Sequence, residues 1–516
     1  MKFNRTKNAS RNILFGVILK IYHILVPFAM RTAMIHLMGV QYLGLDGLFT
    51  SVLSVLNLAE LGVGAAMVYS MYKPVAEDDQ KSICALMRLY KIYYRIIGLV
   101  VLTGGLILLP FIPRLISGDV PDGLNVYVLY LLHLAATVVS YWLFAYKNCL
   151  LQAHQRSDIV SKITFVAHTV RYVLQFVLLF IFRNYYYYLL VALFTQMLIN
   201  VSTAMIVDKM FPDYKAMGQL EPSKRRDINH RIRDLFTAKI GAVIVDSVDT
   251  IVISAFLGLT VLGIYQNYFY IITAITGLVN IIMTSCLAGI GNSIVVEKKE
   301  KVYGDMKVLT FLMTLLNGFC TACMLALYQP FMALWAGKKN MFAMSAVVCF
   351  CIYFFVKQIN TLLNVYKDAA GIWHEDRFRA LVTALSNLCM NLIMVQFWGI
   401  YGVLLSTVLS MLFVGMPWLL HNLFTVLYPK HLLWDYLKQL LFYTAVTATV
   451  CVAAYFLSSL IPFEGIPGLV LRLMIVGAVT AAIYIPIYCR RPEFAKAMKI
   501  VDRITRRKIP LLKKYR

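Results

Sequence analysis

Charged and amide side chains recur on one face of several long apolar segments, and these residues could do chemistry. In segment 11–38, Lys20, His23 and Arg31 fall within about 80° of one another at roughly 100° per helical residue. The same alignment holds within four further segments for Asp46, Thr50, Asn57 and Glu60; for Lys239, Asp246, Asp249 and Thr250; for Gln266, Thr273, Asn280 and Thr284; and for Lys357, Asn360, Thr361 and Asn364. Such rows predict one hydrated interior.

These residue types suit an anionic, hydroxyl-rich ligand. Lysine and arginine pair with phosphate groups, and arginine does so bidentately. Amides and carboxylates can bind sugar hydroxyls, and a carboxylate can also carry a coupling ion or proton. We expect a substrate cavity lined by Arg31, Lys239, Lys357, Asn57, Asn280, Asn360 and Asn364, with Glu60, Asp246 and Asp249 as coupling-ion or ion-pair candidates.

An alternative stays open for every residue in these rows. Ionisable groups inside a membrane are costly and mark functional sites by default. Polar side chains can also join helices through hydrogen bonds and ion pairs, with no part in transport. This structural role weighs more for the amides and hydroxyls than for Arg31, Glu60, Lys239, Asp249 and Lys357.

The segments that carry these rows must be membrane helices. The 516 residues are 60% hydrophobic and 14% charged, whereas a soluble domain is about half apolar and a quarter charged. Continuous apolar runs of roughly 20 residues cross a bilayer as helices, and they lack the alternation of a barrel strand. We predict an all-α integral membrane protein with about 14 spans, at 11–38, 43–72, 92–116, 124–150, 159–183, 185–208, 234–257, 260–293, 306–335, 341–366, 378–398, 400–424, 436–460 and 466–489.

Basic residues orient these spans, because lysine and arginine accumulate in cytoplasmic loops. With the N-terminus inside, the segments assigned to the outside carry Arg114, Arg183, Lys338 and Lys339 out of 49 lysines and arginines. We therefore expect a multi-pass protein of the cytoplasmic membrane with both termini in the cytoplasm. The net charge of +24 is spread over separate loops, which favours contact with anionic membrane lipids and gives no support to nucleic-acid binding.

The longest inner connection divides the chain. We predict an N-terminal six-helix lobe at 1–208, a cytoplasmic linker at 209–233, a C-terminal six-helix lobe at 234–424, and two further helices with a basic cytoplasmic tail at 425–516. Residues 494–508 suggest an amphipathic helix on the inner leaflet, or else a mobile basic tail. Repeated halves are common in transporters, and Gly39 and Gly44 recur as Gly258 and Gly263 at the corresponding outer hairpin.

Signals for an enzyme are missing from the sequence. It contains no Walker A motif, no G-x-S-x-G and no H-E-x-x-H. The outer loops are too short for a catalytic domain. Cys320 and Cys323 have redox-like spacing but lie in an apolar span, where packing is the better interpretation. We expect no enzyme activity, no cofactor and no metal site.

Two stretches resemble a known family. Arg31, with the following Leu-Met-Gly39 and Tyr42-Leu-Gly44, is similar to the opening of polysaccharide-biosynthesis flippases of the O-antigen and capsule type, and so is 391–407 (N-L-I-M-V-Q-F-W-G-I-Y-G-V-L-L-S-T). These flippases belong to the multidrug/oligosaccharidyl-lipid/polysaccharide (MOP) exporter superfamily. The resemblance implies a MATE-like fold of two six-helix lobes plus two C-terminal helices, and alternating access. It also implies a polyprenyl-diphosphate oligosaccharide as cargo, and glycosyltransferases or a polymerase of the same pathway as partners.

The second half departs from this pattern, because Asp249 stands where the first half has Arg31. The cavity is therefore not expected to be simply basic. A MATE-like exporter of drugs or small solutes remains an alternative, as do a membrane glycosyltransferase or polymerase and a lipid scramblase or scaffold. A lipid-linked cargo needs room for its long tail, and we expect helices at 436–489 to pack on the second lobe and form a groove for it.

Overall fold

The computed structural model describes residues 5–118 and 120–504, with the backbone alone for residues 5–18, 238, 239, 242, 246, 503 and 504. Every regular element in these residues is helical, which confirms the all-α prediction. The helices are Arg5–Leu37 (α1), Val40–Leu56 (α2), Val63–Ala76 (α3), Gln80–Leu108 (α4), Val126–Trp142 (α5), Asn148–Ala153 (α6), Ser157–Phe182 (α7), Tyr185–Met210 (α8), Pro222–Val296 (α9), Lys299–Trp335 (α10), Met344–Ala369 (α11), Arg379–Trp398 (α12), Ile400–Ser410 (α13), Met416–Asn422 (α14), Leu432–Ser459 (α15), Gly465–Tyr488 (α16) and Pro492–Ile504 (α17).

Eleven helical stretches of the described residues are long and apolar enough to cross a membrane, or twelve if α5 and the bent segment Ala145–Ala153 form one span. The stretch of α9 that qualifies has 54 residues, roughly 80 Å at 1.5 Å per residue, far more than a bilayer core of about 30 Å. It is broken at Gly258, whose φ of 87° and ψ of 173° are not helical. This break lies between the spans predicted at 234–257 and 260–293. The number fourteen stays a prediction.

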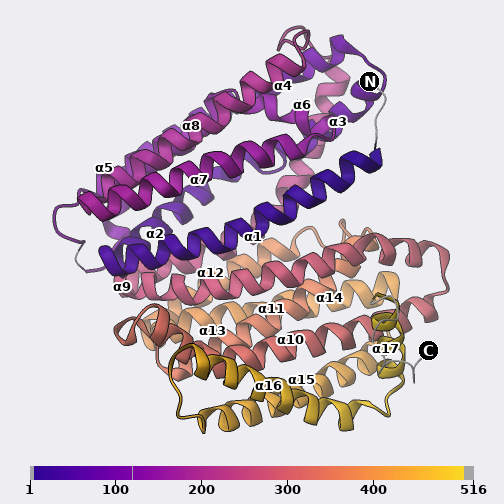
Figure 1. The fold of residues 1–516 in the computed structure, drawn as a ribbon. Coiled ribbons are helices and arrows are strands. Elements are labelled where there is room, and N and C mark those ends of the chain that lie inside the picture. Colours follow the sequence, from indigo (N-terminus) through magenta and orange to yellow (C-terminus); the bar gives the residue numbers. More distant parts are fainter. Residues whose placement is uncertain (1–4, 119, 505–516) are drawn as a thin grey trace. The chain divides into compact units, whose positions relative to one another are not determined.

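The chain forms two compact units, Met1–Gln266 and Asn267–Arg516, and each is described here by itself (Figure 1). In unit 1, α7 packs against α1 and α8, α5 against α4 and α8, and α3 against α4 and α6. The first part of α9, up to Gln266, belongs to this unit. The predicted lobe boundaries around 209–233 stay a prediction.

The second span of unit 1 is interrupted. After α2 the chain makes a short 3-10 turn over Asn57–Glu60 and then passes through Gly62, which has a φ of 87°. An L side chain rarely adopts that φ. A Cβ at Gly62 would also lie 2.7 Å from Cβ of Leu235 and 3.0 Å from the carbonyl oxygen of Ile232. The start of α9 therefore packs directly on the break between α2 and α3.

The repeated glycine pattern is a reciprocal contact inside unit 1. A Cβ on Gly44 would collide with the carbonyl oxygen of Leu259, and a Cβ on Gly263 would collide with that of Val40. Gln41 Nε2 donates to Thr260 Oγ1 at 3.1 Å. Val40 and Leu259 each come one residue after the first glycine of their segment, Gly39 or Gly258. Gly44 and Gly263 each come five residues after it. Segments 39–44 and 258–263 thus pack on each other with local two-fold pseudosymmetry.

Unit 2 is organised around α10, which packs against α11, α15, α16 and α17. Phe311 of α10 contacts the rings of Tyr443 on α15 and Tyr488 on α16. The last pair of helices thus packs on the preceding ones. Part of the apolar side of α17 packs on the same core, where Ala497 is fully buried. Residues 505–508 of the predicted amphipathic segment lie outside the described residues, and its place on the inner leaflet stays a prediction.

Candidate functional site

Glu60 lies at the break between α2 and α3 and is bound by hydroxyl groups. Tyr94 Oη donates to its Oε1 at 3.0 Å, and Tyr141 Oη donates to its Oε2 at 3.1 Å. Tyr90 Oη donates in turn to Tyr94 Oη at 2.6 Å. The three tyrosines come from α4 and α5. Two hydroxyl groups from different helices therefore hold this carboxylate in place, and its role as a coupling-ion or ion-pair group stays a prediction.

Asn57 lies one turn before Glu60 in the same 3-10 segment. Its Oδ1 is buried and has no hydrogen-bond partner among the described residues. A buried amide oxygen of this kind costs about 1–3 kcal/mol if it stays unpaired. It is therefore a position at which water or a ligand hydroxyl would be stabilising.

The other predicted residues that lie in unit 1 divide into two groups. Arg31 is half-buried on α1, Asp249 is buried on α9, and both are engaged in interactions. The side chains of Lys239 and Asp246 lie outside the described residues. The sequence prediction for these four residues stays a prediction.

Lys357 lies near the middle of α11 in unit 2. Its Nζ donates to Tyr353 Oη at 2.8 Å, and the ammonium group lies 5.2 Å from the Tyr353 ring centroid and 5.8 Å from that of Phe269. Aromatic faces stabilise a desolvated cation by roughly 0.5–2 kcal/mol. One turn away, Oδ1 of Asn360 is buried without a hydrogen-bond partner in the part of the chain that is described, and so is Oδ1 of Asn280 on α9.

Asn364, two turns from Lys357, belongs to a buried ionic network. Arg379 donates from Nε to Asp376 Oδ1 at 2.6 Å and from Nη2 to Asp376 Oδ2 at 2.8 Å, and Nη2 also donates to Asn364 Oδ1 at 2.7 Å. Lys367 lies 3.4 Å from Asp376, and Asn422 donates to Asp376 at 3.2 Å. This network fixes the ends of α11, α12 and α14, so Asn364 has a structural partner. The sequence analysis did not single out Arg379 or Asp376.

The two faces of α11 differ in chemistry. Lys357, Asn360, Thr361 and Asn364 share one face, while the opposite face lines an apolar groove of about 930 Å³. At roughly 100° per residue the two sets are centred about 160° apart. The groove lies between α10, α11, α14 and α15, and its α11 wall consists of Val348, Cys351, Ile352, Phe355, Val356 and Ile359. Its rim includes the exposed side chains of Ile352 and Leu441.

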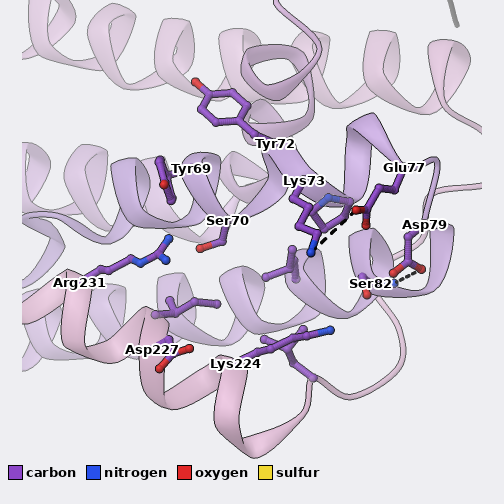
Figure 2. Close-up of a pocket in the computed structure, with 14 residues that line it drawn as sticks. Tyr69, Ser70, Tyr72, Lys73, Glu77, Asp79, Ser82, Lys224, Asp227 and Arg231 are labelled. Atoms are coloured by element: carbon purple, nitrogen blue, oxygen red, sulfur yellow. Dashed lines mark hydrogen bonds and ion pairs between the residues drawn. The ribbon is translucent and has the colours of Figure 1, made fainter.

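Figure 2 shows a second, polar pocket of about 480 Å³ between α3, the start of α4 and the start of α9. The Arg231 guanidinium lies 4.5 Å from the ring centroid of Tyr69. Lys73 pairs with Glu77 at 3.8 Å. Asp79 caps α4 by accepting from the Ser82 amide, and the hydrogen bonds from Ser82 hold the pKa of Asp79 below its ordinary value. Cations and carboxylates alternate around this pocket, so it has no strong preference for an anion.

The structure shows a further intramembrane cation that the sequence analysis missed. Arg171 lies near the middle of α7, more than ten residues from either end. Its Nε donates to Gln175 Oε1 at 3.2 Å. An arginine at the centre of an apolar run is a signal in itself because its burial in lipid is costly, and it could have been found from its position within 159–183.

These features define a class of protein: a multi-pass α-helical membrane protein whose intramembrane cations and carboxylates are held inside helix bundles. The chain belongs to the family of polysaccharide biosynthesis proteins, whose model matches residues 9–287. The matched region contains the first of the two motifs, Arg31 to Gly44, and the predicted family is confirmed. No curated protein matches the chain.

Several solved structures share the fold of this chain. The lipid II flippase MurJ in an inward closed conformation is 14% identical, with a TM-score of 0.62 over 92% of this chain and 99% of that one. An inward-facing multidrug resistance MATE family transporter of the MOP superfamily is 14% identical, with a TM-score of 0.57 over 79% and 98%. A variant of the Vibrio cholerae MATE transporter VcmN is 14% identical, with a TM-score of 0.54 over 81% and 96%. At this identity the likeness shows the fold, which the chain shares with these flippase and transporter structures.

Proposed function

We propose that this chain is a flippase that moves a polyprenyl-diphosphate-linked oligosaccharide across the cytoplasmic membrane by alternating access, for cell-surface polysaccharide biosynthesis. Family membership supports the pathway, and a structural relative is itself named as a lipid II flippase. No enzyme step is needed for this role. Anionic membrane lipids, and glycosyltransferases or a polymerase of the pathway, are the proposed partners.

The two-faced helix α11 carries the proposal. A lipid-linked saccharide has a charged, hydroxyl-rich head and a long hydrocarbon tail, and no single cavity suits both parts. One face of α11 offers the Lys357 ammonium and the unpaired Oδ1 of Asn360. The other face lines the apolar groove. Head and tail could therefore be bound on opposite sides of one helix.

The second candidate, a MATE-like exporter of drugs or small solutes, is favoured by the structural likeness to two such transporters. A small solute has no long hydrocarbon tail, so the apolar groove of unit 2 would have no function in an exporter of small solutes. A binding measurement separates the two candidate functions. If the chain is a flippase, the purified protein should bind a polyprenyl diphosphate saccharide and should not bind hydrophobic cations.

The proposed orientation places both termini and residues 209–233 in the cytoplasm. In a variant with its own cysteines replaced, a cysteine at position 225 should react with an impermeant thiol reagent only after the membrane is opened. Labelling of position 225 in intact cells would contradict the orientation.

Substitution of the cations tests the function. Arg31→Ala and Lys357→Ala should leave the protein inserted at normal abundance and abolish export of polymer, because each removes a charge that binds the diphosphate. Arg31→Lys should restore export only in part, since the bidentate fork is lost. Lys338→Ala, which removes an exposed loop lysine, is the control and should export normally. Normal export per molecule in both alanine variants would refute the proposed role of these cations.

A further inference from the structure

A polar cluster in unit 1 has no role in the proposal above. Asp46 of α2 and His133 of α5 face each other with 4.0 Å between Oδ1 and Nε2, and their side chains are 40% and 13% exposed. Nε2 of His133 is buried and has no hydrogen-bond partner among the described residues. Both residues lie about 10 Å inside their helices, six or seven residues from the first residue of the helix. A gap of 4.0 Å is too long for a direct hydrogen bond.

The surroundings of the pair come from five helices. Arg171 of α7 lies within electrostatic range of His133, and Gln175 holds it while also donating to the carbonyl oxygen of Tyr188 at 2.8 Å. Tyr172, Tyr185 and Tyr188 lie within electrostatic range of Asp46. The further titratable groups that contact these rings, Phe49 beside His133, or one another are Tyr42 of α2, Tyr130 of α5, His168 of α7, and Tyr22 and His23 of α1. Helix α4 also packs on α5, but its Tyr94 contacts Glu60. Glu60 is also bound by Tyr141, which lies eight residues, or about 12 Å, along α5 from His133.

This arrangement suits a proton better than a metal ion. Among the described residues no group of three or more histidine, cysteine or carboxylate side chains could hold a metal. The guanidinium of Arg171 also repels a second cation. Of the two side chains that face each other, the imidazole is the one whose ordinary pKa lies near the physiological range.

We propose that Asp46 and His133 form a proton-binding site. One proton from water bonds to the lone pair of Nε2, and the imidazolium then donates to the Asp46 carboxylate at about 2.8 Å. Closing the gap from 4.0 Å draws α2 and α5 together by about 1 Å. The binding of the proton does not depend on the proposed cargo, whereas its use to drive export rests on the proposed function.

A shift of α2 toward α5 would also affect the contact between α2 and segment 258–263. Asp46 follows Gly44 by two residues on α2, and Gly44 packs without a gap against the carbonyl of Leu259. A shift of this part of α2 must disturb the reciprocal contact between 39–44 and 258–263. Protonation of the pair would therefore act on that contact.

Titration of His133 tests the binding site without any cargo. The protein is reconstituted in lipid nanodiscs with labelled histidine, and the His133 resonance is identified by its loss in His133→Gln. Asp46→Asn should move its midpoint to lower pH by about one unit, because an anion that stabilises the imidazolium is removed. Arg171→Gln should move the midpoint to higher pH, because a cation is removed. An absent titration between pH 4 and 9, or a midpoint unchanged in both variants, would overturn the proposal.

A second measurement tests the link to the glycine contact. An environment-sensitive dye on a cysteine at position 38, beside the 39–44 segment, should change its emission between pH 5 and 8 in the parent protein. The change should be lost in His133→Gln and kept in His36→Gln, which removes an exposed histidine of α1. The same pH response in His133→Gln would show that the pair does not act on this contact. Neither measurement depends on export. Both results can therefore be interpreted even if the proposed cargo is wrong.

Discussion

At the scale of single residues, side-chain type alone does not separate structural from functional polar groups. Asn364 and Asn360 lie one turn apart on the same face of α11. Asn364 accepts a hydrogen bond from Arg379 at 2.7 Å, while Oδ1 of Asn360 has no partner among the described residues. Asn360 is consequently the better candidate for a ligand, and Asn364 the better candidate for a helix contact.

The buried pair of Arg379 and Asp376 predicts a large loss of stability on truncation. The two side chains are only 9% and 5% exposed, and Arg379→Ala would leave the carboxylate without its bidentate partner. Removing one member of a buried pair costs about 3–5 kcal/mol. Thermal unfolding in detergent should show a marked fall in the midpoint, with lower abundance in cells. Arg377→Ala, at an exposed neighbouring arginine, is the control, and equal midpoints for the two variants would contradict the structural role of the pair.

His154, which follows α6 outside the spans, predicts a dependence of stability on pH. Its Nδ1 lies 2.8 Å from the carbonyl oxygen of Leu150, its ring centroid lies 4.4 Å from that of Phe211, and burial lowers its pKa below the ordinary value of 6.5. The unfolded chain therefore binds a proton that the folded chain does not, and the stabilising contribution present above pH 6.5 is lost as pH falls below it. His154→Gln should lose less stability between pH 7 and 5 than the parent protein. His230→Gln, at an exposed histidine, should behave like the parent, and parallel curves for all three proteins would contradict the prediction.

At the scale of elements, breaks in helices place the polar groups. Asn57 and Glu60 lie in a 3-10 turn between α2 and α3, and Gly258 divides α9. Irregular backbone at membrane depth is tolerated where protein covers it. The break at Gly62 is covered by Ile232 and Leu235 of α9, so the interruption of the span is part of the packing and not a defect in it.

The reciprocal glycine contact predicts an intolerance to one added methyl group. Gly44→Ala or Gly263→Ala would force the added Cβ into a carbonyl oxygen of the facing segment. Overpacking of this kind costs about 1–3 kcal/mol. Each variant should show a lower thermal midpoint and a looser 39–44 segment by hydrogen exchange. Gly477→Ala on α16, where a Cβ meets nothing within 4 Å, should be neutral. If all three variants have the parent's stability, the two segments do not pack as closely as described.

At the scale of the molecule, the apolar groove predicts a difference between lipid-linked and small cargo. Ile352→Trp would fill the groove between α11 and α15, whereas Ile485→Trp adds the same volume on the exposed side of α16. Export per molecule should fall several-fold for Ile352→Trp and stay normal for Ile485→Trp, because only the first competes with the lipid tail. Equal export by both variants at equal abundance would show that the tail does not use this groove.

Much of the architecture could be predicted from the sequence because membrane helices are specified locally. Each span must satisfy its own backbone hydrogen bonds and cross about 30 Å of hydrocarbon, so composition and run length are enough to find it. Gly39 and Gly258 could also be recognised in the sequence as boundaries between spans, because glycine adopts a positive φ where other residues rarely do. In the structure, Gly39 precedes α2 and Gly258 divides α9. Even the repeat of two glycines was a true signal of a packing contact.

Sequence alone therefore determined the class, the helical content and the family of this protein, and it identified the segments in which polar residues lie. Tertiary structure alone decided which of those residues meet. Glu60 is bound by tyrosines from α4 and α5, Asn364 by an arginine beyond the end of its helix, and Asp46 faces a histidine 87 positions further along. Such partners are joined by helix packing across long stretches of chain, and periodicity within one helix carries no information about which face of another helix it will meet.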